Sequence, residues 1–185
     1  DEWNYWYGPH VFGEIGTRYF LKDGLGIAAG LHEYYRNSDL YYMANYAQTV
    51  NVIGCIKTSK TAAVFETTGL VLKLYRERFG TVPVATEAVS AGTLDAQAAW
   101  SADRKTLTVA VVNATMREQA IALRVAGAKL SGEGQKWQIA GSDPMAYNDP
   151  GKAMKVVIEE GTVSGVSDKL VVSPCSVTVF ALNAK

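Results

Sequence analysis

The chain has 185 residues, 48% hydrophobic and 19% charged, a composition typical of a globular protein with one or two domains. Its 18 basic and 18 acidic side chains balance, which argues against binding to nucleic acid or to an acidic membrane surface. No apolar stretch reaches the roughly 18 residues of a membrane span. The two cysteines, Cys55 and Cys175, lie in apolar segments and are expected to be buried thiols.

The first segment, Asp1-Glu2-Trp3-Asn4-Tyr5-Trp6-Tyr7, places carboxylates and an amide among four aromatic rings. Aromatic faces stack on the apolar faces of sugars, and glycoside chemistry requires a carboxylate held among them. The alternative interpretation is a short buried strand or an adhesive arm. Gly8-Pro9 breaks the segment, and an irregular loop follows through about Phe20.

The next elements alternate between helix and strand. Apolar residues recur at helical spacing from Lys22 to Arg36, which predicts a helix with His32 and Glu33 at its edge and outer face. Leu40 to Tyr46 is predicted to be a strand. A second helix is expected from Thr61 to Arg78, ending at Gly80, and Pro83 is expected to begin a linker. The alternation indicates βα units.

The pattern of the second half of the chain predicts a sandwich of about eight short antiparallel strands, with the topology of a jelly roll. The clearest are Thr106 to Asn113, Ala120 to Val125, Lys136 to Ala140, Met154 to Ile158, Lys169 to Ser173 and Ser176 to Leu182. Residues 101–104 and 131–134 are predicted to be turns. Trp100, Trp137 and Tyr147 are expected to pack in a core rather than bind sugar.

Several motifs together resemble one family. Asp1-Glu2-Trp3-Asn4 with Tyr5-Trp6-Tyr7 is similar to the seventh-strand motif of family-51 glycoside hydrolases, the α-L-arabinofuranosidases. The segment Tyr46-Ala47-Gln48-Thr49-Val50-Asn51-Val52-Ile53 resembles the eighth-strand pattern of the same family. Asn148-Asp149-Pro150 and the segment 173–179 resemble its C-terminal sandwich. The resemblance implies an α/β plus all-β fold. Residues 1–88 would be the last two βα units of a (β/α)8 catalytic barrel, and residues 89–185 an antiparallel β-sandwich (jelly roll).

The resemblance also implies a site. Glu2 would be the catalytic nucleophile, Trp6 would line the sugar subsite, and Gln48 would contact the arabinofuranose. A retaining glycosidase needs a second carboxyl group about 5 to 5.5 Å away. Asp1 cannot provide it, because neighbouring residues of a strand point to opposite faces. In the family this acid/base Glu lies on an upstream segment that this sequence lacks, so we expect the chain to be active only with that missing part.

We therefore expect this chain to be the C-terminal portion of a retaining exo-α-L-arabinofuranosidase that acts on arabinoxylan, arabinan or arabino-oligosaccharides. No metal or organic cofactor is implied, nor is a nucleic-acid or membrane partner. A companion polypeptide carrying the rest of the barrel, and a homo-oligomer, are the expected protein partners. Two alternatives remain: a non-catalytic carbohydrate-binding or assembly sandwich, and a family member that cleaves β-linked glucans or xylans. The sequence does not distinguish a cytoplasmic from a secreted protein.

Overall fold

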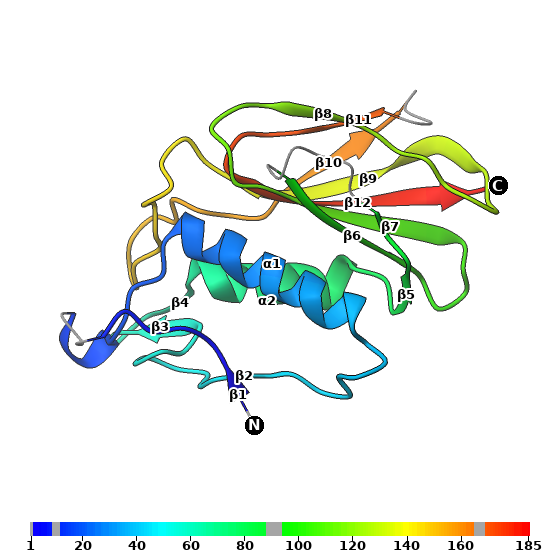
Figure 1. Cartoon of the computed structure of the whole chain (residues 1–185). Helices are drawn as coiled ribbons and strands as arrows, with labels where there is room; N and C mark the ends of the chain where they lie inside the picture. Colours follow the sequence, from blue (N-terminus) through cyan, green and yellow to red (C-terminus); the bar gives the residue numbers. More distant parts are fainter. Residues whose placement is uncertain (1, 9–11, 88–93, 165–168) are drawn as a thin grey trace.

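The computed structural model describes residues 2–8, 12–87, 94–164 and 169–185. Two helices lie between a small pair of parallel strands and a six-stranded antiparallel sheet, and a further two-stranded sheet covers the sheet's other face (Figure 1). Neither helix combines the length and the apolar character that crossing a bilayer would require in the part of the chain described. The described chain is thus a layered, mixed α/β structure.

The first half contains β1 (Glu2–Trp3), a 3-10 helix η1 (Gly13–Ile15), α1 (Leu21–Arg36), β2 (Asn45–Tyr46), β3 (Ile56–Thr58), β4 (Ala63–Phe65), α2 (Thr67–Arg78) and β5 (Val82–Val84). The second half contains β6 (Leu94–Trp100), β7 (Thr106–Asn113), β8 (Gln119–Ala122), β9 (Leu130–Ala140), β10 (Glu159–Val163), β11 (Lys169–Val172) and β12 (Ser176–Ala184).

The prediction of the first helix is confirmed: α1 begins at Leu21, one residue before the predicted start, and ends at Arg36 as predicted. It begins where Phe20 is extended, and the Asp23 carboxylate accepts the Phe20 backbone N–H at 2.7 Å, which satisfies a free donor of the first turn. This helix packs against α2. A Cβ on Gly24 would lie 3.2 Å from the carbonyl oxygen of Thr67, so the missing side chain lets the two helices approach closely.

The second helix begins later than predicted, at Thr67 instead of Thr61. Residues 63–65 form β4, which pairs antiparallel with β3, and Glu66 is extended. The expectation was wrong because Val64 lies four residues before Thr68, a spacing that suits a helix. A hairpin uses the same residues at a period of two.

Two further expectations along the first half are corrected. Residues 40–44 are not a strand, because β1 pairs only with Asn45 and Tyr46, and the side chains of residues 40–43 are exposed. Pro83 does not begin a linker but lies in β5, opposite Ala99 of β6. β5 is the edge strand of the large sheet, where a proline is tolerated because its missing N–H faces no partner strand.

The six-stranded sheet runs in the order β10-β9-β12-β7-β6-β5 and is buried on both faces. In β7, Ala110 and Val112 pack toward the helices, whereas Val109 and Val111 pack toward β8 and β11. Antiparallel strands usually alternate between apolar and polar residues because one face meets water. β7 instead has consecutive apolar residues because other elements cover both faces of the sheet at this strand.

Several predicted strands of the second half are confirmed, β7 with the predicted bounds and the others with changed bounds, and two expectations are wrong. Residues 131–134 are not a turn but part of β9, where Gly134 lies against the backbone of Ala181 in β12. Residues 154–158 form no strand. They follow a loop held by buried Asn148, which bonds the backbone of Phe65, Lys155 and Val156. These side-chain bonds replace a strand ladder.

His32 does not lie at the helix edge but is fully buried between α1, α2 and β6. Its Nδ1 lies 2.8 Å from a carboxylate oxygen of Asp95, and its Nε2 lies 2.6 Å from the Tyr75 hydroxyl. Arg36 also pairs with Asp95 at the more exposed end. His32 thereby connects the helix pair to the large sheet through polar contacts.

We predict that Tyr75→Phe lowers the free energy of unfolding by about 1–3 kcal/mol, because it leaves the buried Nε2 of His32 without its partner. Urea denaturation followed by circular dichroism measures the change. Tyr42→Phe is the matched control, since the Tyr42 side chain is fully exposed, and it should change stability by less than about 0.5 kcal/mol. Equal stability of the two variants would contradict the role given to the His32 contacts.

Candidate functional site

The candidate site begins at β1, which runs parallel to β2 with Glu2 opposite Asn45 and Trp3 opposite Tyr46. The Trp3 ring packs on the helix side, where a Cβ on Gly30 of α1 would lie 3.2 Å from it. Adjacent residues of a strand face opposite ways, so Glu2 points away from the helices. Glu2 is exposed on that face.

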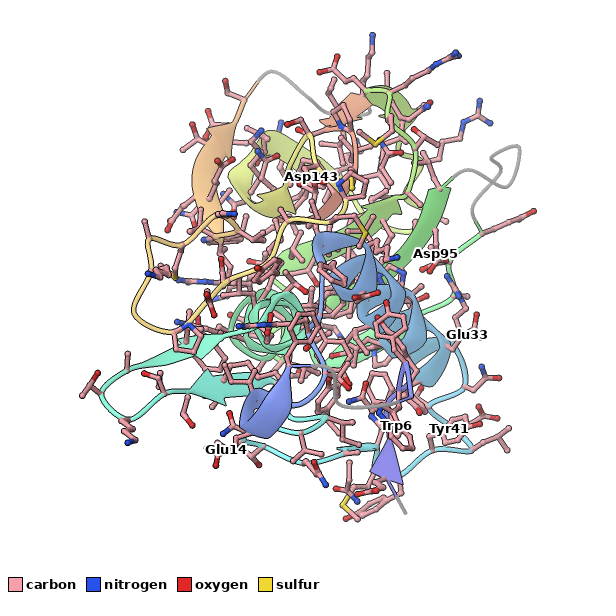
Figure 2. The ribbon with its side chains drawn as sticks, turned by 90° about the vertical axis from the view of Figure 1, so that its left-hand side faces the viewer. Trp6, Glu14, Glu33, Tyr41, Asp95 and Asp143 are labelled. Carbon is pink, nitrogen blue, oxygen red and sulfur yellow. The ribbon has the colours of Figure 1, made fainter. Side chains whose placement is uncertain are left out.

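Beyond the carboxyl ends of the two strands, the chain turns into the segments that carry Trp6 and Gln48. The N–H of Ala47 donates to the Trp3 carbonyl at 2.9 Å, which extends the pairing past β2. The Trp6 side chain is 59% exposed, and Figure 2 shows it at the β1 end of the molecule. The structure thus brings Glu2, Trp6 and Gln48 together on two neighbouring segments. Their catalytic and binding roles stay predictions.

Gln48 lies in a tight backbone loop. Its side-chain oxygen accepts the N–H of Ile53 at 3.2 Å. This oxygen therefore satisfies a backbone donor of the loop, a role that competes with binding to a sugar hydroxyl. The amide nitrogen of the same side chain is a separate donor. Gln48 is exposed, so this nitrogen can be offered to a ligand while the oxygen stays engaged.

Asn4 connects the two segments of the site. Its Nδ2 donates to the Ile53 carbonyl at 2.8 Å and to the Tyr19 hydroxyl at 3.0 Å. Its Oδ1 accepts the N–H of Tyr5 at 2.8 Å. Asn4 therefore fixes the segment after β1 to the loop after β2.

The aromatic residues after Glu2 are anchored to the start of α1. Tyr7 donates its hydroxyl to buried Asp23, and Tyr5 packs edge-on against Tyr7 and Tyr19. Burial, followed by the nearby Asp23 carboxylate, raises the pKa of both Tyr5 and Tyr7 well above the usual range. Both phenols stay neutral donors at physiological pH. Asp1 and His10 lie outside the described residues.

A buried cluster of charges lies behind the site. Arg18 pairs with Glu66 at 3.4 Å and with Asp149, and it donates to the Asn148 carbonyl at 3.3 Å. Lys57 is fully buried nearby, and its ammonium donates to the Val52 carbonyl at 3.1 Å. Burial raises the pKa of Glu66 to about 7, although Arg18 and Lys57 both attract the carboxylate's charge.

Sequence reasoning missed this cluster. The sequence held one indication for Glu66, because an acidic residue directly before Thr67 and Thr68 suits the start of a helix. The prediction that the helix starts at Thr61 placed Glu66 inside the helix instead. Arg18 and Lys57 had no signal, because single charged residues in loops and short strands are normally exposed. Glu14, the acidic residue of η1, is exposed.

The described residues offer no evident metal site, since no three of their His, Cys, Asp and Glu side chains converge. Cys175 is buried and Cys55 is partly buried, and both are free thiols. Most of the exposed large apolar side chains come from the first half of the chain: Trp6, Tyr7, Phe12, Leu40, Tyr41, Tyr42, Met43, Val50 and Phe65. The site therefore lies on the apolar side of the described structure.

Comparison with known proteins agrees with the motifs. The family model described as the α-L-arabinofuranosidase C-terminal domain matches residues 1–176. The chain therefore belongs to the family of α-L-arabinofuranosidase C-terminal domains, which occur in glycoside hydrolases of family 51.

Individual relatives support the same assignment. A probable α-L-arabinofuranosidase C from Aspergillus flavus is 32% identical over an alignment 178 residues long, which covers 86% of this chain and 34% of the relative. The crystal structure of an α-L-arabinofuranosidase from Thermotoga maritima in complex with arabinose superposes with a TM-score of 0.88 at 26% identity. That match covers 99% of this chain and 42% of the other. The family-51 enzyme of Thermotoga petrophila gives a TM-score of 0.81, also at 26% identity, over 98% of this chain and 42% of its own. The chain thus spans about a third of the length of the Aspergillus flavus relative.

The buried cluster gives a testable pH dependence. The pKa of Glu66 is about 7 in the folded protein and near 4.5 when unfolded, so between these values only the folded state holds the proton. The free energy of unfolding should therefore rise as the pH falls from 7 to 4.5, by up to about 3 kcal/mol from this group. Urea denaturation at pH 7.5 and pH 5 measures it.

Glu66→Gln should remove this contribution, whereas Glu77→Gln, on the exposed end of α2, should keep it. If all three proteins show the same difference between the two pH values, the pKa assigned to Glu66 is wrong.

Proposed function

We propose that this chain is the C-terminal portion of a retaining exo-α-L-arabinofuranosidase. It would release terminal α-L-arabinofuranosyl groups from arabinoxylan, arabinan or arabino-oligosaccharides. The observation that carries the proposal is the placement of Glu2 on the exposed face of β1, next to the parallel segment that carries Gln48. The arabinose complex of the Thermotoga maritima relative supports the sugar class.

The proposed reaction has two steps. The Glu2 carboxylate attacks the anomeric carbon, the glycosidic C–O bond breaks, and the leaving oxygen takes a proton from a second carboxylic acid. Water, deprotonated by that same group, then attacks the glycosyl-Glu2 ester and regenerates the carboxylate. We place the second carboxyl group outside this chain, on a segment contributed by the rest of the barrel.

Trp6 and Gln48 would bind the sugar. The exposed indole of Trp6 presents a flat apolar surface of the kind that packs on a sugar ring, and the Gln48 amide nitrogen is a donor for a hydroxyl. Neither interaction needs a metal or an organic cofactor.

We further propose the division at residues 88 and 89, although β5, at residues 82–84, pairs with β6 and so belongs to the large sheet. Within residues 1–88, β1-α1 and β2-α2 would be the last two βα units of a (β/α)8 barrel, because β1 and β2 are parallel and joined through α1. Residues 89–185 would form the jelly-roll sandwich. The exposed apolar residues near β1 and β2 suit contact with the other barrel strands, on a companion polypeptide or a longer chain. Homo-oligomer formation stays a prediction.

The alternative of a carbohydrate-binding sandwich has less support. The exposed large apolar side chains of its described residues are Met116, Met145, Met154, Val157 and Val171, with no aromatic ring among them. Trp137 is buried in the core between sheet and helices, as expected, and Trp100 packs against the core on the other face. Such a surface lacks the stacking rings that sugar-binding platforms use.

We predict that Glu2→Gln lowers kcat on an aryl α-L-arabinofuranoside by at least about 10³-fold in the enzyme that contains this chain, because an amide cannot form the ester intermediate. Glu14→Gln, which changes an exposed carboxylate in the same region, is the matched control and should retain activity.

A second variant tests the role of Glu2 and not only its importance. Glu2→Ala should regain cleavage of the aryl glycoside when azide is added, since the small anion can enter the space left by the carboxylate and displace the aryl group from the anomeric carbon. The product should be a glycosyl azide of inverted configuration, which NMR identifies. Normal turnover by Glu2→Gln would refute the nucleophile assignment.

A further inference from the structure

We propose that Lys57 is a positioning residue that orients the Gln48 side chain through the Val52–Ile53 peptide bond. The proposal deepens the proposed function, on which it rests for the contact between Gln48 and the sugar. Lys57 lies in β3, on a different element from Gln48, and is fully buried.

The loop that follows β2 has an unusual backbone. Gln48, Asn51 and Val52 have φ angles of +59°, +52° and +48°, in the left-handed region. For a β-branched residue such as Val52 this conformation is strained, and it persists only where the surroundings determine it. Contacts to this loop therefore fix the position of Gln48.

Three contacts hold Val52 in place. Its carbonyl oxygen accepts the Lys57 ammonium at 3.1 Å and the Thr17 N–H at 2.7 Å. Gly16 lies directly against the Val52 backbone, where a Cβ would collide with it. Of these contacts, only the one from Lys57 is made by a side chain, so it can be removed without changing the backbone.

The contact made by Lys57 acts on Gln48 through one rigid peptide group. The Val52 carbonyl and the Ile53 N–H belong to the same peptide group, which is planar, so fixing one end fixes the direction of the other. The Ile53 N–H donates to the Gln48 side-chain oxygen at 3.2 Å. This bond turns the Gln48 amide nitrogen away from the loop. A free Val52–Ile53 peptide would allow the side chain to rotate.

The position of the Lys57 ammonium makes this contact sensitive to pH. It lies 5.4 Å from the centre of the Tyr19 ring. The charged or titratable groups that act on it are Glu66, Arg18 and Cys55. Burial lowers the pKa of Lys57 to about 8; the Glu66 carboxylate opposes this shift and Arg18 adds to it. Above that pH the amine is neutral and donates a weaker hydrogen bond.

The test is a double-mutant cycle in the enzyme that contains this chain. Lys57→Met keeps the apolar stem and removes the donor, and Lys60→Met, an exposed lysine of the same hairpin, is the control. We expect Lys57→Met to raise KM for an aryl α-L-arabinofuranoside about 10-fold with kcat nearly unchanged, which is the loss of one hydrogen bond. Lys60→Met should behave as wild type.

The second half of the cycle separates positioning from general support. In a Gln48→Ala background, Lys57→Met should have no further effect on KM, because the side chain that it orients is gone. An equal KM increase in both backgrounds would overturn the proposal. If Lys57→Met does not fold, the pH dependence decides: KM should rise from pH 7 to 9.5 in wild type but not in Gln48→Ala, and identical profiles would overturn it.

Hydrogen exchange tests the contact without relying on activity. The amides of Ile53 and Thr17 should exchange at least several-fold faster in Lys57→Met than in Lys60→Met, and unchanged exchange would refute the proposal. An enzyme that shows this change but does not hydrolyse arabinofuranosides would refute the proposed function alone. An active enzyme with unchanged exchange and unchanged KM would refute only the role of Lys57.

Discussion

The helix pair α1 and α2 is covered on both sides, and the other layers take their positions from it. On one side, the large sheet packs against the helices with the apolar residues of β7, β9 and β12. On the other side, the Trp3 ring rests on Gly30. A larger residue at position 30 would push β1 outward and move Glu2 with it, so the location of the candidate nucleophile depends on a residue without a side chain.

Charge, and not only apolar contact, connects the layers. His32 joins the helices to β6 through Asp95, and Arg18 joins Glu66 to Asp149 of the loop after β9. Buried ion pairs seldom stabilise a fold more than apolar residues of the same size would. Their value here is geometric, because a charged pair tolerates little displacement. These ion pairs thereby fix the position of the segments before and after the candidate site relative to the second half of the chain.

The sequence predicted elements where one physical signal dominated. Apolar residues at helical spacing located α1, and the β-branched run of β7 located that strand to the residue. The errors came from tertiary contacts. His32 is polar and was assigned to a helix edge, but Asp95 and Tyr75 satisfy both ring nitrogens inside the core. The site residues were found through motifs. Glu66 was missed because its partner Arg18 is distant in sequence, and Lys57 because a lone lysine in a short strand is normally exposed.

The position of β12 in the large sheet affects how the protein is made. Residues 176–184 form the strand between β7 and β9, and they pair with both neighbours along most of its length. During synthesis, β7 and β9 emerge from the ribosome tens of residues before this strand and meanwhile have no neighbour on their inner edges. Exposed strand edges favour association with other chains. The sheet can close only after residue 184 has been synthesised, so the incomplete chain presents two unpaired strand edges until its last described strand is made.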